Sequence, residues 1–254
     1  MNKILLIVNP NLKDLNKAIN DVNYELRNHI VNFFNWPLDN ESAYKLLDEL
    51  LCDVDTVITL GGDGSMLKVA ELVFKHDVNL LGINYGGIGY LTSLKKDELS
   101  LLNTEYYIEK RGMLDVFIND GEHHFALNDV VICKTNINIP IKLSVDDGSV
   151  VSNYFADGII VSTATGSSAY SYSSGAPLIE EGKIILTPIC PVNRSSRYKI
   201  YNDDVVFKIN SYRDNRDSAY LSIDGSSSIC INKNDIVTVK KAFKKLKIVR
   251  FKND

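Results

Sequence analysis

The residues best placed to do chemistry form the run Gly61-Gly62-Asp63-Gly64. Glycines let backbone N–H groups approach a phosphate closely, and the positive end of a following helix favours an anion. A turn that only bound phosphate would gain nothing from the Asp63 carboxylate, since the two negative groups repel each other. Asp63 could instead accept a proton from a hydroxyl group held beside the phosphate. The alternative is a tight turn whose aspartate only caps the helix, and these four residues alone do not separate the two interpretations.

A second candidate for ligand binding is the stretch 157–179, which is rich in hydroxyl side chains. Ile159 to Ile179 carry no charge, and the β-branched run Ile159-Ile160-Val161 that leads in is unlike a flexible linker. The density of hydroxyls and glycines argues against a membrane span. A serine nucleophile is disfavoured, because G-x-S-x-G is absent and none of the four histidines suggests a triad. What remains is a buried polar surface of small side chains, suited to a flat, hydrogen-bonding ligand such as a nucleotide.

Two shorter signals have a similar character. Asn128 and Asp129 are adjacent polar residues inside the apolar run 126–131, so they must find partners, either in an internal network or in a ligand. Asp224-Gly225 follows the apolar residues Leu221 and Ile223, and a simple turn is the more probable interpretation of that pair alone.

The elements around the first run predict a parallel α/β layer over residues 1–100. Thr56–Leu60 is a β-branched run typical of a strand buried on both faces, and helical spacing begins after Ser65, a candidate N-cap. The glycine spacing matches neither a Walker loop nor the Rossmann pattern G-x-G-x-x-G. Similar strands and helices alternate along this region, with strands at 4–8, 31–34 and 79–84 and helices at 15–30 and 42–51. The glycine turns at 61–64 and 86–89 both follow strands and are therefore expected at the same sheet edge.

After residue 100 the pattern changes to short strands without intervening helices. These strands are predicted at 106–109, 114–118, 124–131, 142–145, 159–161, 204–209, 236–240 and 246–251. Asn119-Asp120-Gly121 and Asp146-Asp147-Gly148 are strong hairpin signals. We therefore predict two domains, an α/β domain over 1–100 and a mostly antiparallel β domain over 101–254.

Composition and charge limit the class of protein to which the chain can belong. The 254 residues have the composition of an ordinary globular protein, and the net charge of −4 without a basic block gives no support for nucleic-acid binding. Four scattered cysteines without a C-x-x-C pair favour reduced thiols over a disulfide framework or a zinc site. The first apolar run is too short for a signal peptide, and no segment reaches membrane-spanning length. The expected location is the cytoplasm.

Taken together, these motifs resemble the NAD kinase family over most of the chain. Gly61–Gly64 is similar to the family's G-G-D-G signature, and Asn84–Leu91 to its N-x-G-x-L-G-F-L segment. Asn128-Asp129 matches an N-E/D pair, while 187–191 and Asp224-Gly225 resemble its P-I-x-P and late D-G elements. The most specific match is Asp157–Tyr170, which resembles the family's D-G-x-x-x-S-T-P-T-G-S-T-A-Y run. The G-G-D-G turn also occurs in lipid kinases and phosphofructokinases.

This resemblance implies transfer of a γ-phosphoryl group to the 2′-hydroxyl of the adenosine ribose of NAD, which gives NADP. Asp63 would be the base, and Gly61, Gly62 and Gly64 would bind the phosphates of the donor. The NAD-binding set would contain Gly64, Tyr90, Asn128, Asp129, Asp157, Thr165, Ser168, Ala169, Tyr170 and Asp224. Asp157 would meet the nicotinamide end and Asp224 the ribose and phosphates, with most of the others at the adenosine end. No protein metal site is implied, since Mg²⁺ would arrive with ATP or polyphosphate. The resemblance also implies a homodimer or homotetramer.

The sequence departs from the family pattern in several places. Ala164 replaces the usual proline and Ser168 a threonine, while Phe155 stands where many members have an arginine. Many members also have a helix after the last strand that returns to the first domain, and no such helix is predicted here. Two other functions remain open: a lipid or sugar kinase that shares the G-G-D-G turn, and a non-catalytic NAD(P)-binding regulator. Residues 157–179 argue against a lipid acceptor, and Asp63 argues against the regulator.

Overall fold

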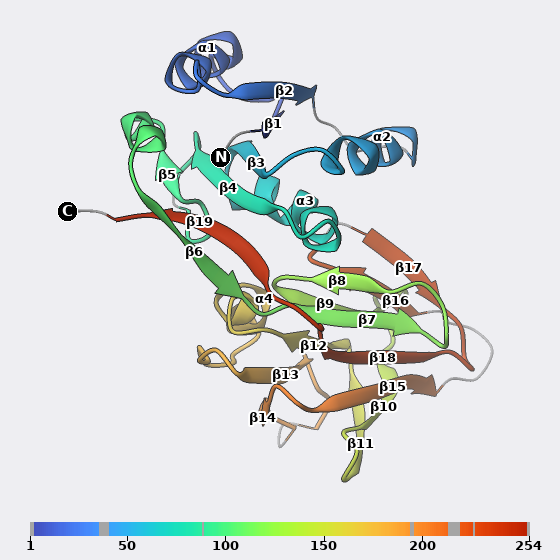
Figure 1. Ribbon diagram of the computed structural model, residues 1–254. Coiled ribbons are helices and arrows are strands. Elements are labelled where there is room, and N and C mark those ends of the chain that lie inside the picture. Colours follow the sequence, from blue (N-terminus) through green and yellow to red (C-terminus); the bar gives the residue numbers. More distant parts are fainter. Residues whose placement is uncertain are drawn as a thin grey trace. The chain divides into compact units, whose positions relative to one another are not determined.

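The chain folds into two units in the computed structural model, which describes residues 3–35, 41–87, 89–193, 196–212, 219–225 and 227–252 (Figure 1). Unit 1 contains Met1–Lys110 and Leu246–Asp254, and unit 2 contains Arg111–Lys245. The chain therefore leaves the first unit, builds the second and returns to the first. The predicted division at residue 100 differs from this arrangement, because local strand and helix patterns cannot show that a distant segment returns.

Unit 1 is built on one seven-stranded sheet with the strand order β2-β1-β3-β4-β19-β6, in which β5 also pairs with β4. The pairs among β1, β2, β3, β4 and β19 are parallel, as predicted for an α/β layer. The strands are β1 Lys3–Val8, β2 Ile30–Asn35, β3 Thr56–Gly61, β4 Asn79–Asn84, β5 Leu94–Lys95, β6 Tyr106–Arg111 and β19 Leu246–Phe251.

The helices of unit 1 connect these strands. They are α1 Leu15–Glu25, α2 Glu41–Leu51 and α3 Asp63–Lys75, with a 3₁₀ helix η1 at Leu99–Asn103. Helix α3 buries its apolar stripe, including Met66, Val69 and Val73, and packs against β3, β4 and β19. Strand β3 is buried along its whole length, as its β-branched sequence predicts.

Unit 2 consists of two antiparallel sheets. The first has the order β11-β10-β15-β18-β7-β8, with β7 Leu114–Ile118, β8 His124–Ala126, β10 Ile141–Asp146, β11 Val151–Ala156, β15 Val206–Tyr212 and β18 Ile236–Lys241. The second has the order β14-β13-β12-β9-β16-β17, with β9 Asp129–Lys134, β12 Gly158–Ser162, β13 Lys183–Ile189, β14 Lys199–Asn202, β16 Ala219–Ile223 and β17 Ser227–Ile231. After β12 come a 3₁₀ helix η2 (Gly166–Ser168) and a short helix α4 (Tyr170–Ser173).

Alternate residues of both sheets in unit 2 form one hydrophobic core. The alternation is clearest on β7 and β18, where Leu114 and Val116 are buried together with Val237 and Val239. From the second sheet, β9, β12, β13 and β16 contribute alternate apolar residues to the same cluster. This two-sheet core confirms the predicted antiparallel second unit.

Three local predictions are wrong. Residues 124–131 form two strands in different sheets rather than one, with a break at Leu127 and Asn128. Strand β6, predicted in the second domain, belongs to the sheet of unit 1. Helix α3 begins at Asp63, with Gly62 rather than Ser65 as its N-cap.

Both predicted hairpin turns are present, between β7 and β8 and between β10 and β11. Ile88, Arg194 and Ser195 lie outside the described residues.

No helix within the described ranges is both long enough and apolar enough to cross a membrane. All four cysteines are free thiols.

Candidate active site

The Gly61–Gly64 run joins the carboxyl end of β3 to the start of α3. A Cβ atom added at Gly61 would lie 2.1 Å from Ser65 Oγ, so the packing of the turn itself requires glycine at that position. At Gly62 and Gly64, by contrast, an added Cβ would meet nothing within 4 Å, and neither residue has a positive φ. The fold therefore requires only the first of the three glycines. The other two leave backbone at a helix N-terminus open to a ligand.

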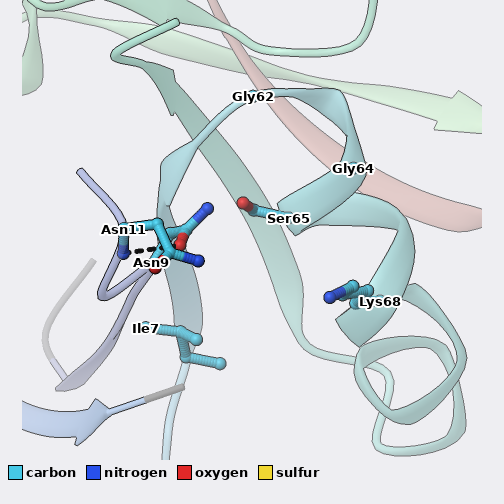
Figure 2. Close-up of a pocket in the computed structure, with 7 residues that line it drawn as sticks. All are labelled: Ile7, Asn9, Asn11, Gly62, Gly64, Ser65 and Lys68. Carbon is cyan, nitrogen blue, oxygen red and sulfur yellow. Dashed lines mark hydrogen bonds between the residues drawn. The ribbon is translucent and has the colours of Figure 1, made fainter. Parts of the chain in front are cut away.

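A cavity of about 280 Å³ lies beside this turn (Figure 2). Its lining residues come from the end of β1, the loop after it and the first turns of α3: Ile7, Asn9, Asn11, Gly62, Gly64, Ser65 and Lys68. Asn9 lies next to β3, since its N–H donates to Leu60 O at 3.1 Å, and its Oδ1 accepts from Asn11 N–H at 3.0 Å. The cavity combines a helix N-terminus with a lysine and two amides, which suits a phosphate group.

Asn9, Asn11, Ser65 and Lys68 were not among the predicted ligand-binding residues. Two signals could have found them. Asn9 follows a strand, so it belongs to the same carboxyl edge as the glycine turn. Lys68 lies four residues after Gly64, which places the two positions on one face of a helix.

The Asp63 carboxylate is fixed by three consecutive backbone N–H groups. Oδ2 accepts from Tyr90 N–H at 2.8 Å, and Oδ1 accepts from Leu91 and Thr92 N–H at 3.0 and 3.1 Å. The alternative that Asp63 only caps its own helix is wrong, because its carboxylate binds the N–H groups of a different loop, and the N-cap residue of α3 is Gly62. Oδ2 carries one of these three bonds, so it retains lone-pair capacity for a further donor.

The second glycine turn holds the loop that Asp63 contacts. Asn84, buried at the end of β4, accepts from Gly86 N–H and donates to Gly87 O, both at 2.8 Å. A Cβ atom at Gly89 would lie 2.2 Å from Thr92 Oγ1 and 3.2 Å from Asp63 Oδ1. Glycine at 89 thus allows the chain to pass close to the Asp63 carboxylate. Tyr90 itself is 80% exposed, and its backbone N–H makes the contact with Asp63.

A second cavity, of about 400 Å³, lies in unit 2. It is lined by five of the predicted NAD-binding residues, Asn128, Asp129, Ala169, Tyr170 and Asp224, together with Val131, Cys133, Ser222 and Gly225. The last four were not predicted, although Val131, Cys133 and Ser222 alternate along β9 and β16 with residues of the core. Segments that are far apart in sequence therefore meet at one cavity.

Asp224 organises one wall of this cavity. Its carboxylate accepts N–H groups from Leu127, Asn128 and Asp129 at 2.7, 2.7 and 3.0 Å, which breaks the strand between β8 and β9. Its own N–H donates to Asp129 O at 3.0 Å, and its φ is +48°. Burial, and secondly the nearby Asp224 charge, raise the pKa of the Asp129 carboxyl to about 7.

The hydroxyl-rich segment after β12 packs against the same Asn128 backbone. Thr163 Oγ1 donates to Leu127 O at 2.6 Å and accepts from Gly166 N–H at 3.1 Å. A Cβ at Gly166 would lie 2.1 Å from Asn128 O, so this turn also requires glycine. The segment is only partly the buried surface that was predicted. Its buried hydroxyl residues are Ser162, Thr163, Ser167 and Ser171, whereas Ser168 and Tyr170 are exposed.

Three other predicted residues of unit 2 do not line the cavity. Asp157 forms an ion pair with Lys134 at 2.6 Å. Thr165 has a buried hydroxyl without a hydrogen-bond partner in the described part of the chain, and Ser168 Oγ donates to Thr165 O at 3.3 Å.

Tyr170 links Asp157 electrostatically to the cavity. Burial, and then the charges of Cys133, Cys190, Asp129 and Asp157, raise the pKa of Tyr170. Asp157 is therefore within electrostatic range of a residue that lines the cavity. Among the described residues there is no group of three or more His, Cys, Asp or Glu side chains arranged to hold a metal ion.

Comparison with known proteins gives consistent matches along the chain. Residues 22–107 match the ATP-NAD kinase N-terminal domain, and residues 127–251 match the ATP-NAD kinase C-terminal domain. The chain is 37% identical to an NAD kinase of Caldicellulosiruptor saccharolyticus over 249 residues, which cover 94% of this chain and 91% of that one. It is 36% identical to an NAD kinase of Methanothermobacter thermautotrophicus over 211 residues, with coverage of 80% and 74%.

Two solved structures share the fold. Yeast NADH kinase complexed with NADH aligns with a TM-score of 0.82 at 20% identity, covering all of this chain and 84% of the other. An Archaeoglobus fulgidus NAD kinase in complex with ATP aligns with a TM-score of 0.77 at 22% identity, with coverage of 99% and 94%.

Proposed function

This chain belongs to the NAD kinase family and is a phosphotransferase that phosphorylates NAD, and we propose that Asp63 is the base of that reaction. In this proposal the γ-phosphoryl group of ATP passes to the 2′-hydroxyl of the adenosine ribose, giving NADP and ADP. The observation that carries it is the position of Asp63. Its carboxylate is fixed by three N–H groups directly beside two glycines whose backbone is open to a ligand.

The donor phosphates are proposed to bind at the cavity of unit 1. Gly62 and Gly64 present backbone at the N-terminus of α3, and Lys68 supplies a positive charge in the same cavity. Asn9 and Ser65 add neutral polar groups. We expect Mg²⁺ to enter with the nucleotide, because this ion usually binds through substrate phosphates and retains several waters. When bound, it neutralises charge on the phosphates during transfer.

The acceptor is proposed to bind at the cavity of unit 2. Tyr170 offers an aromatic side chain, and Asn128 and Asp129 offer an amide and a carboxyl in a partly apolar wall that includes Val131 and Ala169. This combination suits a nucleoside with a flat base and hydrogen-bonding edges. The flanking segments, which carry Thr165 and Asp157, are proposed to serve the rest of the dinucleotide. The related yeast enzyme was crystallised with NADH and the Archaeoglobus enzyme with ATP, which supports this pair of substrate classes.

Asp63 is proposed to act at the acceptor hydroxyl. The remaining lone pair of Oδ2 accepts the 2′-hydroxyl proton while the ribose oxygen forms its bond to the γ-phosphorus and the bond to the ADP oxygen breaks. The three amides keep the carboxylate in one orientation, so little reorganisation is needed at the moment of transfer.

The test is NADP formation from NAD and Mg-ATP, with Asp63→Asn and a control, Asp97→Asn, which changes an exposed aspartate of the same unit. We expect Asp63→Asn to lower kcat about 10²- to 10⁴-fold, with Asp97→Asn unchanged. Chelation of divalent ions should abolish the reaction, and replacing ATP with polyphosphate identifies the donor. No NADP from the wild type would refute the kinase, and full activity of Asp63→Asn would refute the base assignment alone.

We also propose that the protein works in the cytoplasm as a homodimer or homotetramer. In support of the oligomer, the edge strands β11 and β14 of unit 2 expose large apolar side chains, including Val151, Phe155 and Ile200. Light scattering measures the mass of the assembly that the purified 28.4 kDa chain forms, and the mass of a monomer would refute the proposed oligomer. Fractionation of the producing cells tests the location. Neither a lipid or sugar kinase nor a non-catalytic regulator is favoured by these observations.

A further inference from the structure

Charged side chains bind both the N–H groups and the carbonyl groups of the backbone segment Tyr90–Thr92. Its N–H groups donate to Asp63, as described above. Its carbonyl groups accept from Arg250, whose Nη1 donates to Leu91 O and Thr92 O, both at 2.9 Å. We infer that Arg250 is a positioning residue that orients the Asp63 carboxylate through this segment. The inference rests on the proposed role of Asp63 as the base.

Arg250 is held rigidly enough to do this. It lies on β19, between β4 and β6 in the sheet, and its side chain is 14% exposed. Its Nε donates to Glu109 Oε2 on the neighbouring strand β6 at 2.7 Å. The guanidinium is planar with a fixed fork of donors, so the bond to Glu109 sets the direction of the Nη1 bonds. A lysine has a single flexible ammonium and cannot reproduce this fixed geometry.

The arrangement of charges favours a single orientation of the loop. Carbonyl oxygens of the segment contact the positive Arg250, and its N–H hydrogens contact the negative Asp63, so the peptide dipoles are aligned between the two charges. Hydrogen bonds arranged in such a chain polarise and strengthen one another. Loss of Arg250 leaves the carbonyls of Leu91 and Thr92 without this donor. The segment is then free to shift, and Asp63 shifts with it.

Arg250 could also serve only to stabilise the sheet, and the experiment must separate these two roles. The matched control is Lys247 on the same strand, whose Nζ forms an ion pair with Asp77 at 2.6 Å and also donates to the Asp77 carbonyl. Arg250→Met and Lys247→Met each remove one cation and one ion pair from β19. Arg250→Lys keeps the charge without the fork.

We expect Arg250→Met to lower kcat about 10- to 100-fold, since a displacement of about 1 Å at a reacting group can cost that much. The KM values for NAD and ATP should change by no more than about threefold. Arg250→Lys should recover part of the loss, and Lys247→Met should leave kcat unchanged. Because Arg250→Met removes one partner of the ion pair with Glu109, it is expected to be less stable. The double variant Glu109→Leu/Arg250→Met removes both charges and should regain stability without regaining kcat.

The decisive measurement is a double-mutant cycle with Asp63→Asn, followed with a cycling assay sensitive to small amounts of NADP. If Arg250 acts through Asp63, Arg250→Met should cause little further loss in the Asp63→Asn background. Additive losses would overturn the inference, as would equal kcat values for Arg250→Met and Lys247→Met, or recovery of kcat in the Glu109→Leu/Arg250→Met variant. Full activity of Asp63→Asn would instead overturn the assignment of Asp63 as the base. Measurements on the Arg250 variants alone would not overturn that assignment.

Discussion

Two aspartates in this protein do similar structural work at the level of single residues. Asp63 accepts three consecutive N–H groups in unit 1, and Asp224 accepts three consecutive N–H groups in unit 2. Each carboxylate fixes a loop that borders a proposed substrate site. A sequence reveals the aspartate in both cases but not the loop it holds, because the contacting residues are 27 to 29 and 95 to 97 positions away.

Asp129 gives a prediction about pH at the same scale. Its pKa is raised to about 7 from 3.8, first by burial and then by Asp224, so the folded protein holds a proton on this carboxyl that the unfolded chain releases near pH 4. Stability should therefore fall as pH rises from about 4 to 7, at up to about 1.4 kcal/mol per pH unit from this group. Asp129→Asn replaces the protonated carboxyl with a neutral side chain of similar shape that does not titrate. It should therefore remove the decrease in stability that Asp129 causes. Chemical denaturation at about pH 5 and about pH 8 measures it.

The quantity to compare is the change in the free energy of unfolding between the two pH values, measured for wild type and for Asp129→Asn. Asp97→Asn, at an exposed site, is the control and should follow the wild type. Parallel stability curves for wild type and Asp129→Asn would show that the Asp129 carboxyl titrates as an ordinary aspartate.

At the level of the element, the glycine turn separates what the fold needs from what a ligand needs. Gly61 is required by contact with Ser65, whereas Gly64 lies in the first turn of α3 with open space around it. Glycine is a poor helix former, so its presence at position 64 lowers stability. This loss of stability occurs where the backbone borders the proposed donor cavity.

Gly64→Ala is therefore expected to raise stability by up to about 1 kcal/mol and to lower kcat/KM for ATP at least tenfold. The added methyl group would stand between the turn and the phosphates. Gly61→Ala should instead unfold at lower temperature, because its Cβ would clash with Ser65. Thermal unfolding and steady-state kinetics on both variants give the answer. An active Gly64→Ala enzyme with an unchanged KM for ATP would show that the turn is not part of the donor site.

Much of the local structure follows from sequence patterns, and the failures in strand assignment share one physical cause. Strand β4 and the Asp146–Gly148 hairpin depend on neighbouring residues, and both were predicted. The break between β8 and β9 depends on Asp224, and the place of β6 depends on β19, so neither is visible locally. The five predicted NAD-binding residues that share a cavity were assigned to NAD through the family resemblance. Arg250 was missed because no local pattern marks a residue that acts on a distant segment, whereas Lys68 was missed although its spacing from Gly64 offered a local signal.

At the level of the whole molecule, unit 1 is completed by the last strand of the sequence. Leu246, Ile248, Val249 and Phe251 are buried in this unit, and β19 separates β4 from β6. The proposed donor cavity and Asp63 thus lie on a sheet in which one interior strand is made from sequence that follows the entire second unit.

Truncation after Lys245 is expected to abolish activity and to cause aggregation, since β4 and β6 would expose unpaired edges and apolar side chains. Truncation after Lys252 keeps β19 and is the matched control, which should retain both solubility and turnover. Size-exclusion chromatography and NADP formation report the two properties. A soluble, active protein ending at Lys245 would show that β19 is dispensable for unit 1.

The position of β19 also has a consequence for synthesis on the ribosome. Domains near the N-terminus commonly fold while the rest of the chain is still being translated. Here the parallel sheet around Asp63 must wait with a gap between β4 and β6 until residues 246–251 emerge. The antiparallel unit, although its sequence follows most of unit 1, can finish first, so a nascent polypeptide acquires phosphotransfer capacity only after residues 246–251 have emerged.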